Sequence, residues 1–461
     1  MENTPGARAR SARRILAALV ASALFPLAAH AQQTDAQRIQ DLERRLEKSM
    51  ELIERLNARV NQLEQQRGAP PAPAAAPVPA PQAAPAPSQT VQATQAAQEA
   101  RIAALERNAA QAAAAMGHDE HGGMSVAGIP LHAFADVSYE RLGRPQPDGR
   151  NAGFTLGNLD FYLTPSLGRV KMLAELNFEV NDAGEIDTDL ERLQLGYAVS
   201  DAFTGWMGRF HTPYGYWNAT FHHGAQIQTV TRPRFIDFED KGGVLPAHSV
   251  GLWGTGHIPA GGGHLVYDAY VANGSRIVDG TIDFNARHDD NSNKAIGANV
   301  GYRFGGALDG LLLGTHALRE DVNVYVADAL TARTRLAFYG GYFYLDRGPW
   351  EAIGEYYKFR NVDYTGGNVT HSSWASFVQV GYALAERWIP YYRWEDAALD
   401  QTDPYFASQT TGNAYKRNVL GIRYLLNPNT ALKFEANSTR EQFGPDWIKY
   451  TETRAQFAVR F

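Results

Sequence analysis

Charged and aromatic side chains gather between Phe210 and His248, in a stretch without a regular apolar period. Guanidinium groups and carboxylates lie close together in this stretch, so it could bind a charged solute or set the charge of a narrow passage. The residues that we predict to narrow such a passage, including one just before the stretch, are Arg209, Tyr214, Trp217, Arg232, Arg234, Asp237, Glu239 and Asp240. An ordinary surface loop is the alternative interpretation.

Other clusters of reactive side chains are weaker. His118 and His121 flank two acidic residues and could ligate a divalent metal, although a solvated polar loop is the favoured interpretation. No G-x-S-x-G motif occurs and no Cys is present, so neither that serine nucleophile nor a thiolate metal site is predicted. The formal charge of -6 argues against nucleic acid as a partner. We therefore predict no enzyme activity and no cofactor.

The N-terminal residues are predicted to be a targeting signal. Arginines from Arg8 to Arg14 precede an apolar run from Ile15 to Ala28, and the next three residues fit a small-x-small cleavage site. Residues 1–31 are therefore interpreted as a signal peptide that is removed on export.

Three further segments precede the main domain. Residues 32–67 carry apolar residues at heptad spacing, from Ile39 and Leu42 to Val60 and Leu63, and are predicted to form a short periplasmic coiled coil. Residues 68–89 are rich in Pro and Ala, which is typical of an extended linker. Residues 90–128 are predicted to form an Ala- and Gln-rich helix and a loop. The coil predicts self-association without deciding between a dimer and a trimer.

From residue 129 to residue 461 the apolar pattern has a period of two. Val170, Met172 and Phe178, for example, alternate with Lys171 and Glu175. Alternating apolar and charged faces over strands of roughly 8–12 residues indicate a transmembrane barrel. A soluble β-sandwich is disfavoured by the even strand number and by the aromatic residues near strand ends. We predict an all-β transmembrane barrel of about 16 antiparallel strands.

The connections between the strands alternate in length. Short turns such as 346–349 and 427–430 alternate with long loops, which are predicted at 211–248, 274–294, 319–333, 398–415 and 439–449. With the N-terminus in the periplasm, the long loops all fall on the external side, as in bacterial barrels. The strand Trp350 to Arg360 fits least well, because both of its faces carry mixed residues.

A barrel of about sixteen strands is too wide for side chains to fill, so water is expected inside it. By register, basic side chains outnumber acidic ones on the inner wall. The residues that we predict to form this pore wall are Lys171, Arg192, Arg303, Arg393, Arg423 and Arg454, with Arg209 from the first cluster on the same face. Two interpretations stay open: a mixed-charge wall with little selectivity, and a preference for anions.

Several of these features together resemble the bacterial outer-membrane porin superfamily. Gly208-Arg209-Phe210 followed by Pro213-Tyr214-Gly215 resembles the G-[RQ]-F-x-x-P-[FY]-G segment of phosphate-selective porins. The coiled coil before the barrel is similar to that of dicarboxylate-type and sugar-type porins. In trimeric porins the loop after the fifth strand folds inward, and the terminal Phe461 is similar to their assembly signal. The resemblance implies a homotrimer that the barrel-assembly machinery recognises.

The sequence thus predicts a passive pore in the cell outer membrane, surrounded by lipid and open to small hydrophilic or anionic solutes. One alternative is a structural barrel that tethers or spaces the envelope through its coiled coil. A barrel hydrolase is a weaker alternative, because it needs a nucleophile and base that no motif indicates.

Overall fold

The computed structural model describes residues 125–126, 129–143, 152–180, 184–200, 202–221, 227–237, 243–283, 289–385 and 387–460. The predicted signal peptide, coiled coil and linker lie outside these residues, as does nearly all of the predicted helix and loop at 90–128. His118, His121, Glu239, Asp240 and Phe461 lie outside them as well. What was inferred for these segments and residues stays a prediction.

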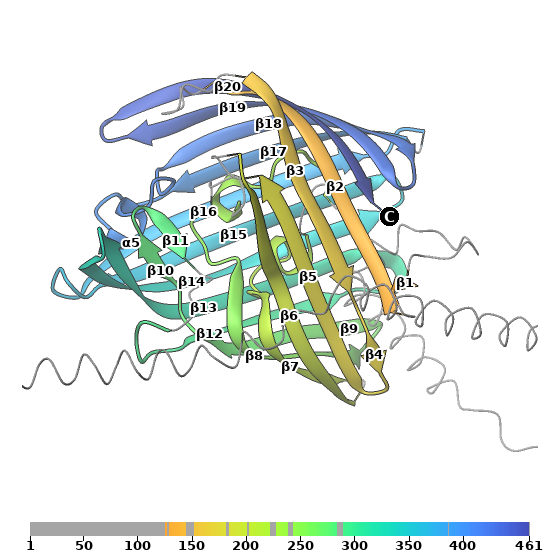
Figure 1. Cartoon of the computed structure of the whole chain (residues 1–461), viewed down its shortest axis with the longest axis horizontal. Helices are drawn as coiled ribbons and strands as arrows, with labels where there is room; N and C mark the ends of the chain where they lie inside the picture. Colours follow the sequence, from red (N-terminus) through yellow and green to blue (C-terminus); the bar gives the residue numbers. More distant parts are fainter. Residues whose placement is uncertain are drawn as a thin grey trace, which may run out of the picture. The chain divides into compact units, whose positions relative to one another are not determined.

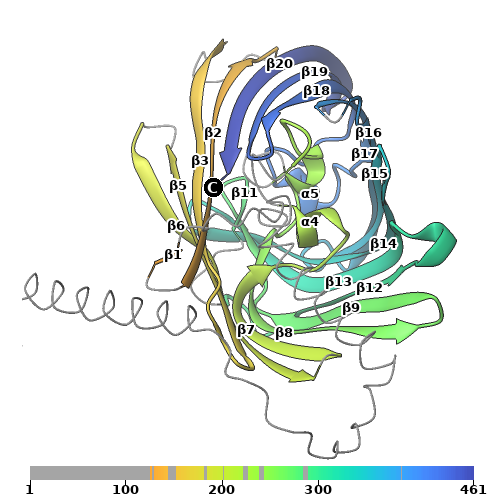
Figure 2. The ribbon, with the colours of Figure 1, turned by 90° about the vertical axis from the view of Figure 1, so that its right-hand side faces the viewer.

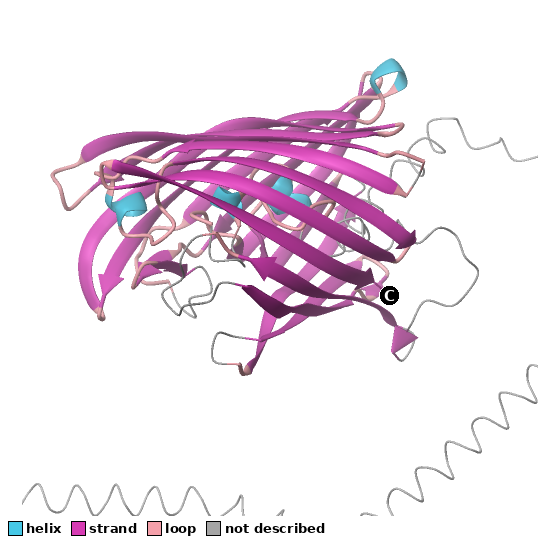
Figure 3. Ribbon diagram, turned by 90° about the horizontal axis from the view of Figure 1, so that it is seen from above, coloured by secondary structure: helices cyan, strands magenta, loops and turns pink. Residues whose placement is uncertain are grey.

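Within the described residues, long antiparallel strands make up nearly all of the regular structure (Figures 1 and 3). Sixteen strands are nine residues or longer: β2 (Ile129–Arg141), β3 (Ala152–Leu163), β5 (Val170–Val180), β6 (Ile186–Ser200), β7 (Phe203–His211), β8 (His248–Ala260), β9 (Gly263–Ala272), β12 (Ala295–Arg303), β13 (Leu311–Val326), β14 (Ala329–Arg347), β15 (Trp350–Asp363), β16 (Val369–Tyr382), β17 (Trp388–Ala398), β18 (Tyr415–Asn427), β19 (Thr430–Phe443) and β20 (Asp446–Arg460).

Short strands, helices and 3₁₀ turns lie in or beside the connections between the long strands. They are the strands β1 (Ser125–Val126), β4 (Ser166–Leu167), β10 (Arg276–Val278) and β11 (Thr281–Asp283), the helices α4 (Trp217–Thr220) and α5 (Pro404–Ala407), and the 3₁₀ turns η3 (Arg234–Ile236) and η4 (Gly306–Leu308). Among the described residues, no helix is long and apolar enough to span a bilayer.

The sheet closes on itself. Each long strand pairs with its neighbour, and β2 pairs antiparallel with β20 from Phe134↔Arg460 to Arg141↔Thr453. Figure 2 shows the resulting ring of strands, with α4 and α5 inside it. Closure gives every one of the sixteen long strands two hydrogen-bonded neighbours, so none of them has an unpaired edge in lipid. The predicted all-β transmembrane barrel of sixteen antiparallel strands is confirmed.

Alternation assigns the two faces of the wall. On β6, Leu195 and Tyr197 are 54% and 50% exposed on the outer face, whereas Arg192 and Gln194, which precede them, are buried on the inner face. The outward side chains are apolar because they face the bilayer, and the inward ones are polar because they face the interior.

Two of the predicted long loops are wrong. Residues 319–333 and 439–449 instead continue β13 into β14 and β19 into β20, with ladder pairs as far as Val326↔Ala329 and Phe443↔Asp446. Polar residues on both faces of these segments suggested loops. In the structure the strands continue, and cross-strand pairs such as Asp321 and Arg335, 3.2 Å apart, use those polar residues. The predicted loop at 211–248 matches the ends of β7 and β8.

Candidate pore and its internal loop

The connection between the fifth and sixth long strands, β7 and β8, enters the barrel; we call residues 212–247 the internal loop. Its neck is closed, because Thr212 N donates to Ala247 O at 2.9 Å and the Thr212 and Ser249 hydroxyls lie 2.8 Å apart. Asn218 Nδ2 donates to both Thr212 O and Ala247 O, which ties α4 to this neck. Thr212 and Ala247 therefore form a short, fixed stem at the base of the internal loop.

Gly215 makes the first bend of the loop possible. Its φ of +61° lies in the left-handed region that favours glycine, and an added Cβ would collide with the Tyr357 hydroxyl and the Glu355 carboxylate. Its amide donates to His316 Nδ1 at 2.8 Å, and its carbonyl accepts from Asn299 Nδ2 at 2.9 Å. Gly215, the second glycine of the sequence motif, is thus the point where the backbone of the internal loop contacts the barrel wall.

Three glutamates on alternate strands hold the backbone of the internal loop. Glu355 on β15 accepts from the amides of Tyr216 and Trp217 at 2.7 and 2.6 Å. Glu435 on β19 accepts from the amides of residues 230 and 231, both at 3.1 Å. Glu395 on β17 accepts from the amide of residue 234 at 2.7 Å. Carboxylates that accept backbone amides are among the stronger hydrogen-bond acceptors in proteins, so the described part of the loop is held at three places.

Arg393 on β17 binds the same segment from the donor side. Its guanidinium is fully buried and donates to Thr231 O and Arg232 O, both at 2.8 Å. It also donates to Glu395 Oε1 at 2.8 Å and to Gln379 Oε1 at 3.2 Å. Because these bonds consume the group's donors, Arg393 is a loop anchor and does not face the lumen water.

Arg234 anchors the end of the loop at η3. Its guanidinium donates to the two Glu441 carboxylate oxygens at 3.0 and 2.7 Å, and it lies 4.9 Å from the Tyr415 ring centroid. Burial opposes the charge of this group, but the hydrogen bonds and the charge of Glu441 raise the pKa of Arg234 above its ordinary value. The pair therefore stays charged and closes the loop against β19.

Aromatic side chains fill the space between the loop and one half of the wall. Tyr214 packs edge-on against Phe338 of β14, Tyr216 stacks on Tyr344 at 4.2 Å, and Trp217 packs edge-on against Phe377 of β16. This packing explains why both faces of residues 350–360 carry mixed residues. The inward side of β15 carries apolar residues, because it packs against the loop and not against water.

A second loop completes this packing. In the connection from β17 to β18, Asp403 caps α5 and accepts from Asn361 Nδ2 at 2.8 Å, and Phe406 packs edge-on against Phe359. Tyr405 Oη donates to Val244 O of the internal loop at 2.5 Å. The two loops support one another, so the interior beside β13–β17 is occupied by protein.

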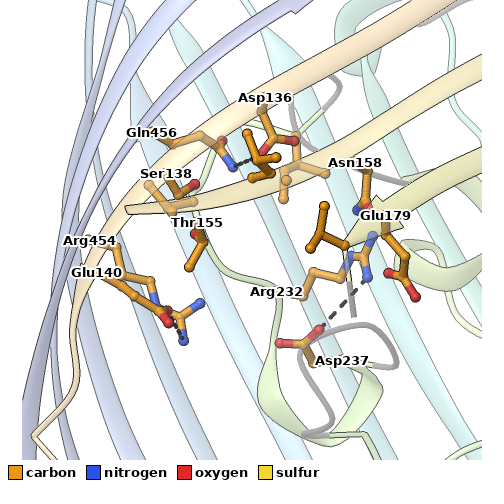
Figure 4. Close-up of a pocket in the computed structure, with 15 residues that line it drawn as sticks. Asp136, Ser138, Glu140, Thr155, Asn158, Glu179, Arg232, Asp237, Arg454 and Gln456 are labelled. Atoms are coloured by element: carbon orange, nitrogen blue, oxygen red, sulfur yellow. Dashed lines mark hydrogen bonds and ion pairs between the residues drawn. The ribbon is translucent and has the colours of Figure 1, made fainter. Parts of the chain in front are cut away.

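A polar cavity of about 210 Å³ remains on the other side of the internal loop (Figure 4). Its wall comes from β2, β3, β5 and β20, and its loop side includes Ile227, Val230, Arg232 and Asp237. Arg454 Nη2 and Glu140 Oε2 lie 3.7 Å apart, and Arg232 Nη1 and Asp237 Oδ1 lie 3.8 Å apart. Each guanidinium in the cavity thus lies beside a carboxylate.

The predicted narrowing residues separate into three groups. Tyr214, Trp217 and Arg234 are buried in the packing between loop and wall. Arg232 and Asp237 line the cavity. Glu239 and Asp240 lie outside the described residues.

Arg209 has the outer strand register, but its side chain is mostly buried and binds Asp189, which pairs with the inward-facing Asn177. Arg209 pairs with Leu193 and Val250, whose side chains are exposed on the outer face. The neighbouring Trp206 and Phe210 take the inner positions, since this part of the interior is apolar. β6 extends beyond its pairing with β7, and Arg209 binds Asp189 there at 3.2 and 3.0 Å.

The other predicted wall residues lie on the inner face but differ in their surroundings. Arg192 is buried in an ion pair with Glu175 and lies over the Tyr162 ring. Lys171 Nζ donates to Ser166 Oγ at 2.7 Å near β4. Arg303 shares the inward register of Asn299, Arg423 pairs with the buried Lys433, and Arg454 lines the cavity.

Sequence reasoning missed several acidic residues of the interior. The inner register also carries Asp136, Glu140, Glu320, Glu351, Glu355, Glu441 and Glu452. Most of them lie near predicted loops or in the poorly alternating strand, where the face of a residue could not be assigned. With them, the excess of basic residues on the inner wall disappears.

Replacing Glu355 with Gln is expected to destabilise the protein by about 1–3 kcal/mol, because the amide removes the negative charge that two backbone donors bind and the oxygen that accepts from the Tyr357 hydroxyl. Heat unfolding of the detergent-folded protein measures this as a lower midpoint. Glu452→Gln is the matched control, since Glu452 accepts from Asn437 Nδ2 on the adjacent strand. Equal unfolding midpoints for the two variants would contradict a role of Glu355 in holding the internal loop.

The closed sixteen-stranded antiparallel barrel is a fold that a solved outer-membrane channel also has. No family model matches the sequence, and no curated protein matches it either. The structure is similar to the outer membrane channel DcaP of Acinetobacter baumannii, with a TM-score of 0.50 and 13% identity over 74% of this chain and 100% of that chain. At this identity the likeness shows a shared fold.

Two further solved structures have lower TM-scores. An outer membrane protein of Vibrio cholerae, OmpT in its trimer form, gives 0.46 with 11% identity over 72% of this chain and 99% of that one. Salmonella typhi OmpF in complex with daunomycin gives 0.44 with 13% identity over 72% and 97% of the two chains.

Proposed function

We propose that this chain is a porin of a bacterial outer membrane, through which small hydrophilic solutes diffuse passively. The observation that supports it best is the polar cavity beside an anchored loop in a closed barrel. A barrel of this size holds water unless protein fills it. Here the apolar filling lies against the wall from β7 to β18. The cavity beside β2, β3, β5 and β20 is the proposed narrow part of the pathway.

Assembly and location are part of the same proposal. The coiled coil at 32–67 would lie in the periplasm and, with the porin resemblance, favours a homotrimer. Phe461 would serve as the signal for the barrel-assembly machinery. The anion preference that the sequence suggests stays a prediction. Two arginines on which it rested, Arg192 and Arg393, are buried in ion pairs.

Conductance across a planar bilayer tests the proposed function. Purified, detergent-folded protein is expected to give stepwise current increments, grouped in threes if the trimer inserts as a unit. Heat-denatured protein is the control. Folding is checked independently by the shift in gel mobility on heating. Folded protein that gives no channels would overturn the pore and favour a closed barrel with an envelope-spacing role.

A further inference from the structure

We propose that the outer face of β18, β19 and β20 binds a phosphate-bearing membrane lipid near the end of the barrel that carries the internal loop. The three strands lie side by side in Figure 1. The inference goes beyond the proposed pore, since it needs only a barrel whose outer face contacts lipid.

Three basic side chains lie next to one another across these strands; we call Lys416, Arg440 and Lys449 the basic row. The ladder pairs Lys416 with Arg440, and Arg440 with Lys449. All three are exposed, and Lys416 shares the outward register of Leu420 on β18. Cross-strand neighbours have Cβ atoms about 5 Å apart, and like charges at that separation destabilise the pair. Negative charge beside the row therefore stabilises it.

The protein supplies only part of that negative charge. Asp396 on β17 binds Lys416 at 3.3 Å. The Arg440 guanidinium lies 5.6 Å from the centroid of the Trp447 ring, which carries no formal charge. Within the described residues, neither Arg440 nor Lys449 forms an ion pair. Two positive charges of the row thus remain for an anion from outside the chain.

The carboxylates next to the row in sequence point to the other side of the wall. Glu441 follows Arg440 on β19 and accepts from Arg234 inside the barrel. Glu452 on β20 accepts from Asn437, which is buried on the inner face of β19. Neighbouring residues of a strand alternate between its faces, so these carboxylates belong to the interior.

The basic row lies at the level where lipid headgroups are expected. Trp394 of β17 is 38% exposed and pairs with Asn418, the next outward position after Lys416 on β18. Near the other end of β18, Tyr424 packs against Trp388 with ring centroids 4.3 Å apart. Lys416 lies eight residues from Tyr424, which is roughly 20 Å along the barrel axis at about 3.3 Å per residue and a tilt of about 40°. Aromatic girdles flank an apolar band about 25 Å tall, so the row lies at its border.

A groove of about 310 Å³ lies on the same face, between the row and the middle of the barrel. Its outward lining consists of Tyr392, Asn418, Leu420, Ala436, Ser438, Thr451 and Thr453. Small side chains on β19 and β20 leave this space open beside the larger tyrosine and leucine. Because this face contacts hydrocarbon, we assign the groove to an acyl chain, whose phosphate-bearing headgroup then lies beside Arg440 and Lys449.

Native mass spectrometry of the detergent-folded protein with added diphosphoryl lipid A tests the inference. The wild-type protein is expected to retain the lipid. Arg440→Gln combined with Lys449→Gln is expected to weaken binding about 30-fold, because each basic residue near an anionic lipid surface contributes roughly fivefold. Ser438→Phe fills the groove without changing the charge. It is expected to weaken binding about fourfold, the contribution of one buried CH₂ group.

The matched control removes two positive charges from the opposite end of the barrel. Arg169→Gln combined with Arg347→Gln changes two exposed turns, where these side chains donate to Val199 O and Ala307 O. Lipid A binding is expected to stay at the wild-type level. Heat-modifiable gel mobility confirms that each variant is folded. Phosphatidylcholine and millimolar inorganic phosphate are the comparison ligands.

Each outcome decides the inference without reference to conductance. Binding of lipid A that is weakened by the row and groove variants, and not by the control pair, supports it. Equal weakening by both pairs, or equal retention of phosphatidylcholine, overturns it. Displacement of lipid A by millimolar inorganic phosphate would identify a site for the free anion and would overturn the lipid assignment. A row variant that changes the oligomeric mass and leaves lipid retention intact would assign this face to a second copy of the chain.

Discussion

Replacing residues 213–246 with Asn-Gly is expected to raise the single-channel conductance by about two- to fourfold, because a sixteen-stranded lumen without filling is a wide water channel. The stem makes the design possible. Thr212 N and Ala247 O already form a ladder hydrogen bond, so a two-residue type I′ turn can join the strands at that point. The barrel ladder is independent of the loop and should still close.

The matched control puts the same turn where no lumen is affected. Gly444 and the residue after it form an exposed tip between β19 and β20, and replacing them with Asn-Gly should leave conductance unchanged. Both proteins are first checked for heat-modifiable gel mobility, which reports barrel closure. A folded loop-deletion protein with wild-type conductance would mean that the internal loop does not obstruct the pathway.

Replacing Arg393 with Ala is expected to cost about 3–5 kcal/mol of stability, because it leaves the Glu395 carboxylate buried without its nearest cation. It also removes the donors to Thr231 O and Arg232 O, so the second half of the loop loses its anchor. Denaturant unfolding in detergent measures the first effect. Larger and noisier channel currents would report the second.

Two comparisons make the Arg393 result interpretable. Arg347→Ala removes a guanidinium from an exposed turn, where Arg347 donates to Ala307 O, and is expected to cost at most about 1 kcal/mol. The double variant Arg393→Ala with Glu395→Ala removes both buried charges. It should be less destabilised than Arg393→Ala alone, since no unpaired charge remains. A double variant whose loss of unfolding free energy equals the sum of the two single losses would show that Arg393 and Glu395 do not stabilise the protein as a pair.

The sequence by itself determined the barrel. Strict alternation, as at Leu195 and Tyr197, is a local property of each strand. Because the outer face must be apolar where it contacts lipid, a single sequence is enough to show the alternation. The position of the internal loop was also readable, since the ends of β7 and β8 bracket 211–248 as predicted. The bend at Gly215, within the motif that resembles phosphate-selective porins, was seen only in the structure.

The tertiary structure alone decided which charges meet water. Arg393 and Arg454 have the same residue type and the same inward register, yet one is buried under the loop and the other lines the cavity. Arg209 has the outer strand register, yet its mostly buried guanidinium binds Asp189, which pairs with the inward-facing Asn177. Alternation reports only the face of a strand, whereas burial depends on what a distant segment of the chain places against that face.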